Sequence, residues 1–363
     1  MGIGASSKRL QQEVIEQNLC TSCGNCIGIC PYIKTYKERT AFIHPCQLDE
    51  GNCYKVCPRG ETDWAALEEK VFGKQRNDHV LGNIQQLLYA RATDRAISTS
   101  GQYGGTTSAL ISYALEKNKI QGAILTGGKP GMLPEAIIAT SKGEVLTAAG
   151  SKYSAAPTLA KLHEAAKSGL KELGLVGRPC QALAVRKLEH YAEKRADLPV
   201  DKVKLVIGLF CFWALSPDFY DYITEKVNRE PIVSLDINTE NMVIKTTSTD
   251  LVLAIDNIRR FIRPACQHCF DPIAEFADIS IGSTEFDASY NTLIVRSQQG
   301  AQLVQEAVRE GILEIKSYPK ERVDLLLGAV KNKKLRVLKG LHHTTSYLNL
   351  NEAFRDGIEK GGA

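Results

Sequence analysis

The 363-residue sequence has no apolar run of the roughly 18–20 residues that a membrane-spanning helix needs, which excludes a transmembrane protein. Residues 1–7 lack the apolar core of a secretory signal. The net charge is only +4, and no block of lysine and arginine is dense enough to indicate nucleic-acid binding. Low-complexity tracts are also absent. We therefore expect a cytoplasmic protein, either free or bound peripherally to a membrane complex.

Cysteine, by contrast, is abundant. The chain has 11 cysteines, yet it is too large to need disulfides for stability and shows no export signal. Metal binding or redox chemistry is therefore favoured over disulfides. Seven of the cysteines lie between Cys20 and Cys57, and the others are Cys180, Cys211, Cys266 and Cys269. This distribution predicts a small N-terminal module followed by a larger body.

The first cysteine run has the C-x2-C-x2-C-x3-C-P spacing of bacterial ferredoxins. It consists of Cys20, Cys23, Cys26 and Cys30. In ferredoxins the first three thiolates bind one [4Fe–4S] cluster, and the fourth binds a second cluster. Gly24 and Gly28 allow the backbone to approach a cluster closely. Structural zinc is less favoured, because zinc sites usually pair two cysteines with a distant second pair.

The second run is less regular and ends in Cys53-x3-Cys57-Pro58. By the crossover rule, Cys57 completes the cluster held by Cys20, Cys23 and Cys26. The second cluster then receives three thiolates, from Cys30, Cys46 and Cys53. Asp49 stands where a further cysteine is expected. It either binds the fourth iron, or the cluster has only three irons, or Asp49 is a solvated loop carboxylate.

The body alternates apolar strands with helical stretches, which predicts an α/β architecture. Strands are expected at 88–91, 122–126, 173–176, 204–207, 278–281 and 292–296. Helices are expected at 64–73, 108–117, 156–166, 181–195 and 217–227. Residues 231–255 are rich in β-branched residues and turns, which predicts a small antiparallel insertion.

A loop rich in glycine and hydroxyl residues follows the first strand of the body and opens a helix. Its candidate residues are Ser98, Ser100, Gly101, Gly104, Gly105 and Thr106. Such a loop offers backbone N–H groups to a phosphate, although it could simply be a flexible connection. A second polar turn with a cation contains Ser151, Lys152, Tyr153 and Ser154. The first loop matches neither the Walker A motif nor the GxGxxG fingerprint.

The four body cysteines follow apolar strands or lie in proline-bearing loops, where ligand-binding loops converge in open α/β folds. Together they could form one more four-cysteine site. Cys180 could instead be a catalytic thiol, and Cys211 a small buried apolar residue.

These segments, taken in order, resemble the coenzyme F420 hydrogenase/dehydrogenase beta-subunit family over about residues 88–340. The resemblance rests on the loop 98–108, the turn 150–154, the Gly-Arg-Pro-Cys180 and Gly-Leu-Phe-Cys211 motifs, and Cys266-x2-Cys269. The family implies a noncovalent FAD and a nearby [4Fe–4S] cluster bound by the four body cysteines, which makes three clusters in all. It also implies that the loop, the turn and the pair Asn291–Thr292 contact FAD, and we hypothesise that Lys152 stabilises its reduced form. Family members often have Gly-Asp where this chain has Gly282-Ser283.

The family implies an oxidoreductase subunit in which FAD exchanges a hydride with coenzyme F420 as substrate. Single electrons would then pass through [4Fe–4S] clusters to other subunits of a complex of the hydrogenase, formate dehydrogenase or heterodisulfide reductase kind. Two alternatives stay open: a flavin reductase acting on another organic substrate, and a flavin-bearing electron-relay adaptor without a hydride substrate. The absence of aspartate at Ser283 favours these two alternatives.

The predicted fold class is mixed α/β, with a bacterial-ferredoxin-like module joined to an FAD-binding body. Residues 1–60 form the module, 61–87 a linker helix, 88–345 the body and 346–363 a C-terminal tail.

Overall fold

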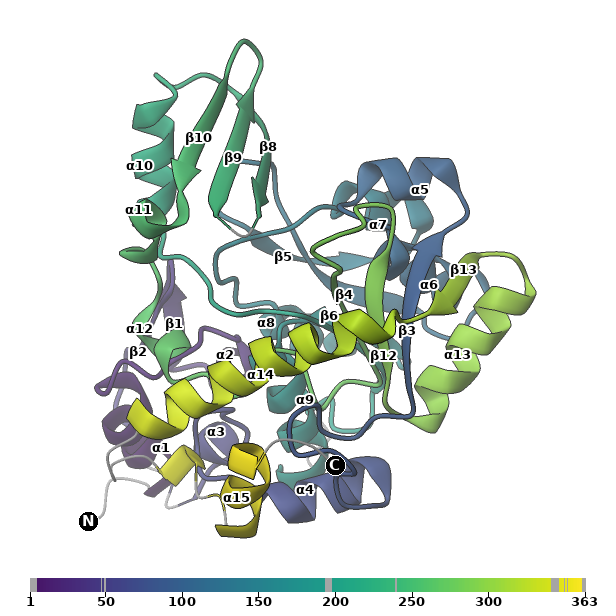
Figure 1. Cartoon of the computed structure of the whole chain (residues 1–363). Coiled ribbons are helices and arrows are strands. Elements are labelled where there is room, and N and C mark those ends of the chain that lie inside the picture. Colours follow the sequence, from purple (N-terminus) through teal and green to yellow (C-terminus); the bar gives the residue numbers. More distant parts are fainter. Residues whose placement is uncertain are drawn as a thin grey trace.

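The computed structural model describes residues 5–46, 48, 50–192, 198–238, 240–340, 346–348, 350 and 352–360. Helices pack on both faces of a large mixed sheet, which confirms the predicted α/β fold class (Figure 1). Asp49 lies outside the described residues, so its role as an iron ligand stays a prediction. No helix in the described part of the chain is long and apolar enough to cross a membrane.

The described residues form a sheet of eight strands in the order β13-β3-β12-β11-β7-β6-β4-β5. Its strands are β3 (Gln86–Ala92), β4 (Gly122–Gly127), β5 (Glu135–Ala139), β6 (Leu173–Gly177), β7 (Val203–Leu209), β11 (Ile279–Ser283), β12 (Asn291–Val295) and β13 (Leu313–Ser317). The four central strands β11, β7, β6 and β4 are parallel, and the outer pairs are antiparallel. All six predicted body strands are present; β5 and β13, at the two edges, were not predicted.

This topology brings several loops to one edge of the sheet. The carboxyl ends of β4, β6, β7 and β11 point the same way because these strands are parallel. β3 shares that direction, since β12 lies antiparallel between β3 and β11. Asn291, which begins β12, pairs with Ser283 at the end of β11. Ligand sites of open α/β sheets lie at this edge.

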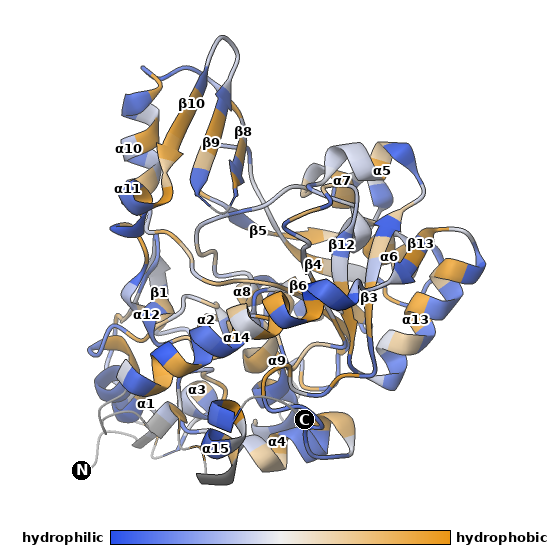
Figure 2. Ribbon diagram, in the orientation of Figure 1, coloured by the Kyte–Doolittle hydropathy of each residue, from blue (hydrophilic) through white to orange (hydrophobic). Residues whose placement is uncertain are grey.

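Helices bury both faces of the sheet. They are α5 (Arg95–Ser100), α6 (Thr106–Glu116), α7 (Lys142–Thr147), α8 (Leu159–Lys167), α9 (Pro179–Tyr191), α13 (Gln298–Arg309) and α14 (Lys320–Gly340). One core lies between the sheet and α6, α7 and α13, and a second lies between the sheet and α8 and α9. Figure 2 shows hydrophobic residues concentrated in the strands and hydrophilic residues on the outer surfaces of the helices. Strands buried on both faces account for the near-continuous apolar runs in the sequence.

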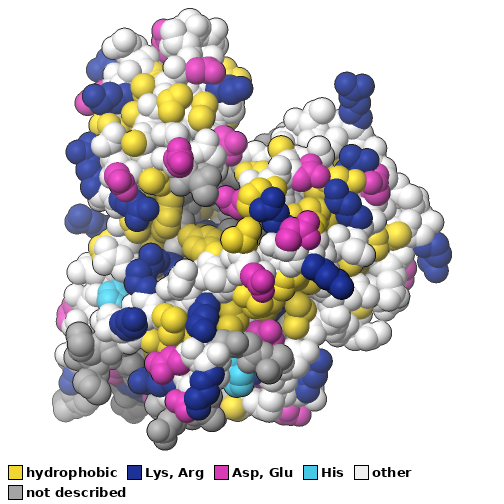
Figure 3. Space-filling view, in the orientation of Figure 1, with side chains coloured by type: hydrophobic (Ala, Val, Ile, Leu, Met, Phe, Trp, Pro, Cys, Tyr) yellow, Lys and Arg dark blue, Asp and Glu magenta, His cyan; other side chains and the backbone are white. Residues whose placement is uncertain are grey.

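The predicted antiparallel insertion is confirmed as a separate lobe. It consists of α10 (Asp218–Lys226), β8 (Ile232–Ile237), β9 (Asn241–Thr246), β10 (Asp250–Ala254) and α11 (Ile255–Arg259). Its own core includes Phe219, Met242 and Ile258. A notch separates this lobe from the rest of the body in the outline of Figure 3.

The cysteine-rich module lies beside α12 and below the lobe in Figure 1. Its elements are α1 (Ala5–Arg9), a π-helix (Leu10–Ile15), α2 (Asn25–Ile29), β1 (Ile33–Tyr36), β2 (Arg39–Phe42) and α3 (Asn52–Lys55). The next helix, α4 (Trp64–Phe72), lies at the predicted linker helix. Three short elements occur much later in the chain: α12 (Pro264–Gln267), the 3-10 turn Ser346–Leu348 and α15 (Glu352–Lys360). Trp64, Phe270 and Phe354 share one aromatic core, which packs α4 and α15 onto the body.

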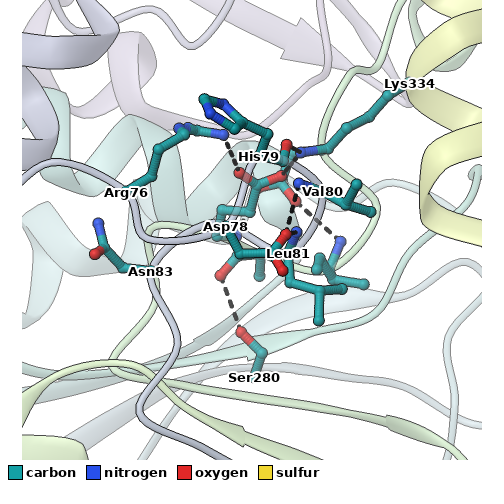
Figure 4. A network of polar contacts seen from close by, with 12 residues as sticks. Arg76, Asp78, His79, Val80, Leu81, Asn83, Ser280 and Lys334 are labelled. Atoms are coloured by element: carbon teal, nitrogen blue, oxygen red, sulfur yellow. Dashed lines mark hydrogen bonds and ion pairs between the residues drawn. The ribbon is translucent and has the colours of Figure 1, made fainter. Parts of the chain in front are cut away.

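A buried charge network fixes the segment that follows the last cysteines. Arg76 Nη1 lies 3.1 Å from Glu275 Oε2, and Lys334 Nζ lies 2.6 Å from Glu275 Oε1. Arg76 also pairs with Glu68 of α4, and all four side chains are at most 5% exposed. Figure 4 shows Arg76 and Lys334 reaching toward the same carboxylate from opposite sides. The network therefore joins α4, α14 and the 270–276 segment.

Candidate functional site

The structure brings together the four cysteines predicted to share the first cluster. Cys20, Cys23, Cys26 and Cys57 line one cavity beneath the π-helix. The first three lie just before or in α2, and Cys57 follows α3. The backbone N–H of Arg59 donates to Cys57 Sγ at 3.5 Å. We refer to these four residues as the inner cysteine group.

A second set, the outer cysteine group, consists of Cys30, Cys46 and Cys53. Burial raises the pKa of Cys53, and the neighbouring Cys30 and Cys46 raise it further. Ser6 Oγ lies 3.5 Å from Cys53 Sγ. The three predicted thiol ligands are therefore neighbours.

The body group consists of Cys180, Cys211, Cys266 and Cys269, and the structure gathers these four residues as well. Cys180 lies in the first turn of α9, Cys211 follows β7, and Cys266 lies in α12. Burial raises the pKa of Cys211 to about 12, with smaller contributions from the other three thiols. The backbone N–H of Ala214 donates to Cys266 Sγ at 3.3 Å.

Two arginines lie beside the body group. Arg178 interacts electrostatically with Cys180, Cys211 and Cys266, and also with Cys23 of the inner group. Its Nη2 is buried and has no hydrogen-bond partner among the described residues. Arg59 interacts with Cys269 and Cys180, and its guanidinium lies 4.4 Å from the Tyr347 ring centroid. Arg178 thus lies close to both the inner and the body groups, and it forms no ion pair with a carboxylate in the part of the chain that the structure describes.

These features fit iron–sulfur clusters better than other uses of cysteine. None of the eleven cysteines, all within the described residues, forms a disulfide. Among the described residues, no three potential ligands surround one point closely enough to hold a single metal ion. A cubane makes a different demand, because each thiolate binds its own iron. N–H donors to sulfur and the uncompensated Arg178 both favour an anionic cluster over neutral thiols.

The module packs closely against the body. The backbone N–H of Leu159 in α8 donates to Cys23 O at 2.9 Å. A Cβ atom at Gly24 would lie 2.4 Å from Pro157 O, and one at Gly28 would lie 2.0 Å from the His163 ring. The sequence predicted that these glycines let the backbone approach a cluster, and in the structure they also make room for α8 and for Pro157, which precedes it.

The predicted phosphate-binding loop is partly helical, because Arg95–Ser100 forms α5. The hydroxyls of Ser98 and Ser100 donate to carbonyls within that helix. Gly101, Gly104 and Gly105 form the loop, and Thr106 begins α6. The backbone N–H of Thr106 donates to Asn291 Oδ1 at 3.2 Å. Asn291 is the first residue of β12, and Thr292 is the second. The loop and the start of β12 therefore meet at the carboxyl edge of the sheet.

The turn 150–154 approaches the same loop. Ser151 donates to the side-chain oxygen of Gln102, and Gln102 Nε2 donates to Leu235 O of the lobe at 2.9 Å. Ser154 pairs with Leu215 in an isolated bridge. Lys152 Nζ donates to Ala149 O and Gly150 O, both at 3.0 Å, and burial lowers its pKa. The Lys152 ammonium group is therefore hydrogen-bonded to carbonyls that follow α7.

A cleft lies between this loop, the lobe and the segment after β11. It is lined by Gln102, Tyr103, Asp236, Glu285, Phe286 and Ala288. Ser283 Oγ donates to Glu285 Oε1 at 2.9 Å. Burial raises the pKa of Asp236, whose carboxylate accepts hydrogen bonds from Gln102 and the backbone of Ile237. The cleft thus has carboxylates at Glu285 and Asp236, although Ser283 itself is not acidic.

Sequence reasoning missed several site residues. Arg178 and Arg59 each lie two residues from a cysteine, and this proximity in the sequence could have indicated that they lie near the thiols. Asp236 and Glu285 gave no comparable signal, because one lies in the insertion and the other in an ordinary polar loop.

Comparisons with known proteins agree with this arrangement. The model of the N-terminal part of the coenzyme F420 hydrogenase/dehydrogenase beta subunit matches residues 87–163. The corresponding model of the C-terminal part of that beta subunit matches residues 170–321. One chain of the solved F420-reducing [NiFe] hydrogenase complex from Methanosarcina barkeri has a similar structure, with a TM-score of 0.67. The two chains are 31% identical, and the match covers 72% of this chain and 92% of that one.

Two curated relatives extend the comparison. The beta subunit of coenzyme F420 hydrogenase from Methanothermobacter thermautotrophicus is 33% identical over 257 residues, covering 69% of this chain and 90% of the relative. A subunit of the F(420)H(2) dehydrogenase from Methanosarcina mazei is 29% identical over 323 residues, covering 86% of this chain and 89% of the relative. The second alignment covers 86% of this chain, which is more than the part that follows residue 86. It therefore includes part of the N-terminal region. The chain therefore belongs to the coenzyme F420 hydrogenase/dehydrogenase beta-subunit family.

Proposed function

We propose that this chain is the FAD-bearing, iron–sulfur electron-transfer subunit of an F420-dependent oxidoreductase complex. Bound FAD would exchange a hydride with coenzyme F420, and three iron–sulfur clusters would carry single electrons to a partner subunit. The inner group would hold one cluster, the outer group with Asp49 a second, and the body group a third. The family and its relatives support an oxidoreductase that works within a complex.

One observation carries this proposal: the candidate FAD loop and the body cysteines share the carboxyl edge of one sheet, and the inner group adjoins the body group. Thr106 follows β3, Cys180 follows β6, and Cys211 follows β7 at that edge. Arg178 interacts with both Cys180 and Cys23. This arrangement supports a path from the candidate flavin loop through the body group to the inner group.

The residues proposed to hold FAD are those that surround the loop and cleft. They are Ser98, Ser100, Gly101, Gly104, Gly105, Thr106, Ser151, Lys152, Tyr153, Ser154, Asn291 and Thr292. The backbone of 101–106 would approach the phosphates, since the hydroxyls of Ser98 and Ser100 are bonded within α5. Lys152 would exchange its hydrogen bonds to the carbonyls of Ala149 and Gly150 for one to the flavin edge. That role stays a hypothesis.

The cleft bears on the choice of hydride partner. The lack of aspartate at Ser283 favoured a different substrate or none. However, Glu285 is hydrogen-bonded to Ser283 and lines the cleft, so a carboxylate is present beside that position. This observation removes the main reason to prefer the two alternatives, and we favour F420.

Anaerobic mixing with reduced F420 tests this choice of substrate. We expect the absorbance of oxidised deazaflavin to return as the bound flavin is bleached, because hydride transfer needs only the two stacked rings. Protein stripped of flavin is the control and should leave reduced F420 unchanged. If the flavin-loaded protein also leaves it unchanged while a chemical reductant bleaches the flavin, the substrate is another molecule.

The cofactor content provides an independent prediction. Protein purified without oxygen should hold one FAD and about 11–12 irons, the number for three cubane clusters with at most one iron missing. A value of about 12 would favour Asp49 as a ligand, and about 11 would favour a three-iron centre. Iron and acid-labile sulfide analysis of the intact chain makes the measurement. About four irons per chain would contradict the assignment of the N-terminal module.

A further inference from the structure

The β1–β2 hairpin carries an unusual outward face. Its register pairs Lys34 with Ala41 and Tyr36 with Arg39. These four residues are all exposed, while Ile33 and Thr40 face inward. Tyr36 is 78% exposed, a high value for so large a ring. The hairpin therefore presents alternating cationic and aromatic side chains to solvent.

Exposed apolar side chains flank this hairpin at its open end. Tyr32 is 44% exposed and its ring meets His44 edge-on, with centroids 5.6 Å apart. Ile43 is 55% exposed, and its backbone N–H donates to Tyr32 O at 2.8 Å. Interfaces are enriched in aromatic residues and arginine, and such a grouping of large apolar side chains is uncommon on a free surface.

The charge of this face is one-sided because its carboxylate is turned away. Glu38, in the hairpin turn, lies 2.6 Å from Arg263 Nε of the body and is half-buried. Lys34, Lys37 and Arg39 stay exposed, and they do not appear in any ion pair formed among the described residues. The body thus neutralises the one acidic side chain of the hairpin and leaves three cations outward.

The hairpin is also covalently tied to the outer cysteine group. Cys30 precedes β1, Cys46 follows β2, and the backbone N–H of Ile33 donates to Cys30 O at 3.3 Å. Cys20 Sγ of the inner group lies 3.4 Å from Thr40 Oγ1 on β2. A partner bound to the hairpin would therefore lie beside the outer group. In the proposed order of body, inner and outer groups, the outer group is the last.

We propose that the β1–β2 hairpin is the docking surface for a one-electron carrier protein with an acidic face. Lys34, Lys37 and Arg39 would steer the approach, and Tyr32, Tyr36 and Ile43 would make the apolar contact. This inference rests on the proposed function, because it assigns the exit point of the proposed electron path. A neutral or basic partner is not expected, because Lys34, Lys37 and Arg39 outnumber Asp218, an exposed carboxylate of α10 close to Glu38.

The test uses the loaded protein and an acidic bacterial-type ferredoxin as probe, with basic cytochrome c as the opposite-charge probe. Binding to immobilised ferredoxin is measured by interferometry across ionic strengths. The triple variant Lys34→Glu, Lys37→Glu, Arg39→Glu should lower the association rate about 10-fold or more at low salt. The difference should shrink as salt rises, because the Debye length falls to about 3 Å at 1 M. Wild type should bind cytochrome c more weakly than ferredoxin.

A matched triple, Lys129→Glu, Lys167→Glu, Lys171→Glu, changes net charge equally at exposed sites on the body. It should leave ferredoxin binding within about 2-fold of wild type. If the two triple variants lose ferredoxin binding equally, the effect is one of net charge alone and the proposal is wrong. The proposal is also wrong if the hairpin triple variant binds ferredoxin as wild type does. Tyr36→Ser should mainly raise the dissociation rate.

A second readout separates this inference from the proposed function. Flavin bleaching by reduced F420 and electron delivery to a small chemical acceptor should be unchanged in the hairpin triple. If wild type itself delivers no electrons to the small acceptor, the proposed function fails. If it does so and the hairpin triple still reduces ferredoxin at the wild-type rate, only the docking surface is wrong.

Discussion

Replacing Glu275 with alanine should lower the free energy of unfolding by about 3–5 kcal/mol, because it leaves the buried Lys334 without its ion-pair partner and removes one of the two carboxylates that face Arg76. Arg76 Nη1 and Lys334 Nζ lie 3.1 Å and 2.6 Å from the two carboxylate oxygens. Arg76 would keep Glu68, but Lys334 would lose its ion-pair partner while remaining 0% exposed. Urea denaturation of the anaerobic, loaded protein measures the change.

A matched control distinguishes this network from ordinary surface pairs. Glu164 pairs with Lys161 at 2.7 Å on α8, with side chains 59% and 35% exposed. Glu164→Ala should therefore change stability by no more than about 0.5–1 kcal/mol. A second variant, Glu275→Ala with Lys334→Met, should recover part of the loss, since it removes the stranded ammonium group. If Glu275→Ala costs no more than Glu164→Ala, the network contributes nothing specific.

The same network predicts a pH dependence with a definite sign. Burial acts to raise the pKa of Glu275, but Lys334 and Arg76 outweigh it and hold the pKa below 4.5. A carboxyl with a depressed pKa in the folded state adds stability above its ordinary pKa and loses it as the pH falls through the lower folded value. The difference between wild type and Glu275→Ala should therefore be constant near neutrality and shrink below about pH 4.5.

The features predicted correctly from the sequence are those that depend on short spacing. The spacing of Cys20, Cys23 and Cys26 indicates that these thiols share a loop, and the crossover rule of ferredoxins adds Cys57, which lines the same cavity. The body cysteines were predicted to converge because Cys180 and Cys211 each follow a strand, and parallel strands end at one edge. The six body strands were found because strands buried on both faces form dense apolar runs.

The features that were missed depend on contacts between distant segments. Arg263 lies more than 200 residues after Glu38, and nothing local to either residue indicates that they pair. Glu285 is hydrogen-bonded to Ser283 and so brings a carboxylate close to the position where family members often have aspartate, which a strict motif comparison cannot detect. Gly24 and Gly28 were correctly singled out for close approach, but the approaching element is α8 rather than a cluster alone. β5 and β13 are short, partly exposed edge strands with a weaker apolar pattern.

The two cysteine groups nearest the body should respond differently to serine substitution. Cys20→Ser removes a thiolate from the inner group, whereas Cys266→Ser removes one from the body group. Serine is nearly isosteric but is far less readily deprotonated, so it is a poor replacement for a thiolate ligand. Each variant should lose up to about four irons relative to wild type. Iron analysis and electron paramagnetic resonance of the reduced proteins measure this loss.

Flavin chemistry should then separate the two variants. Cys20 lies in the N-terminal module, apart from the loop 101–106 and the cleft, so Cys20→Ser should still be bleached by reduced F420 at close to the wild-type rate. Its delivery of electrons to an acidic ferredoxin should fall by about 100-fold or more, as expected when one member of a serial path is removed. Cys266→Ser should show the same loss of delivery and also a lower FAD content, because the Cys266 segment is bonded to the strand-end loops. Lys333 Nζ, for example, donates to both Phe212 O and Cys266 O. Wild-type delivery by Cys20→Ser would place the inner group off the electron path, and the serial arrangement of the three groups would then be wrong.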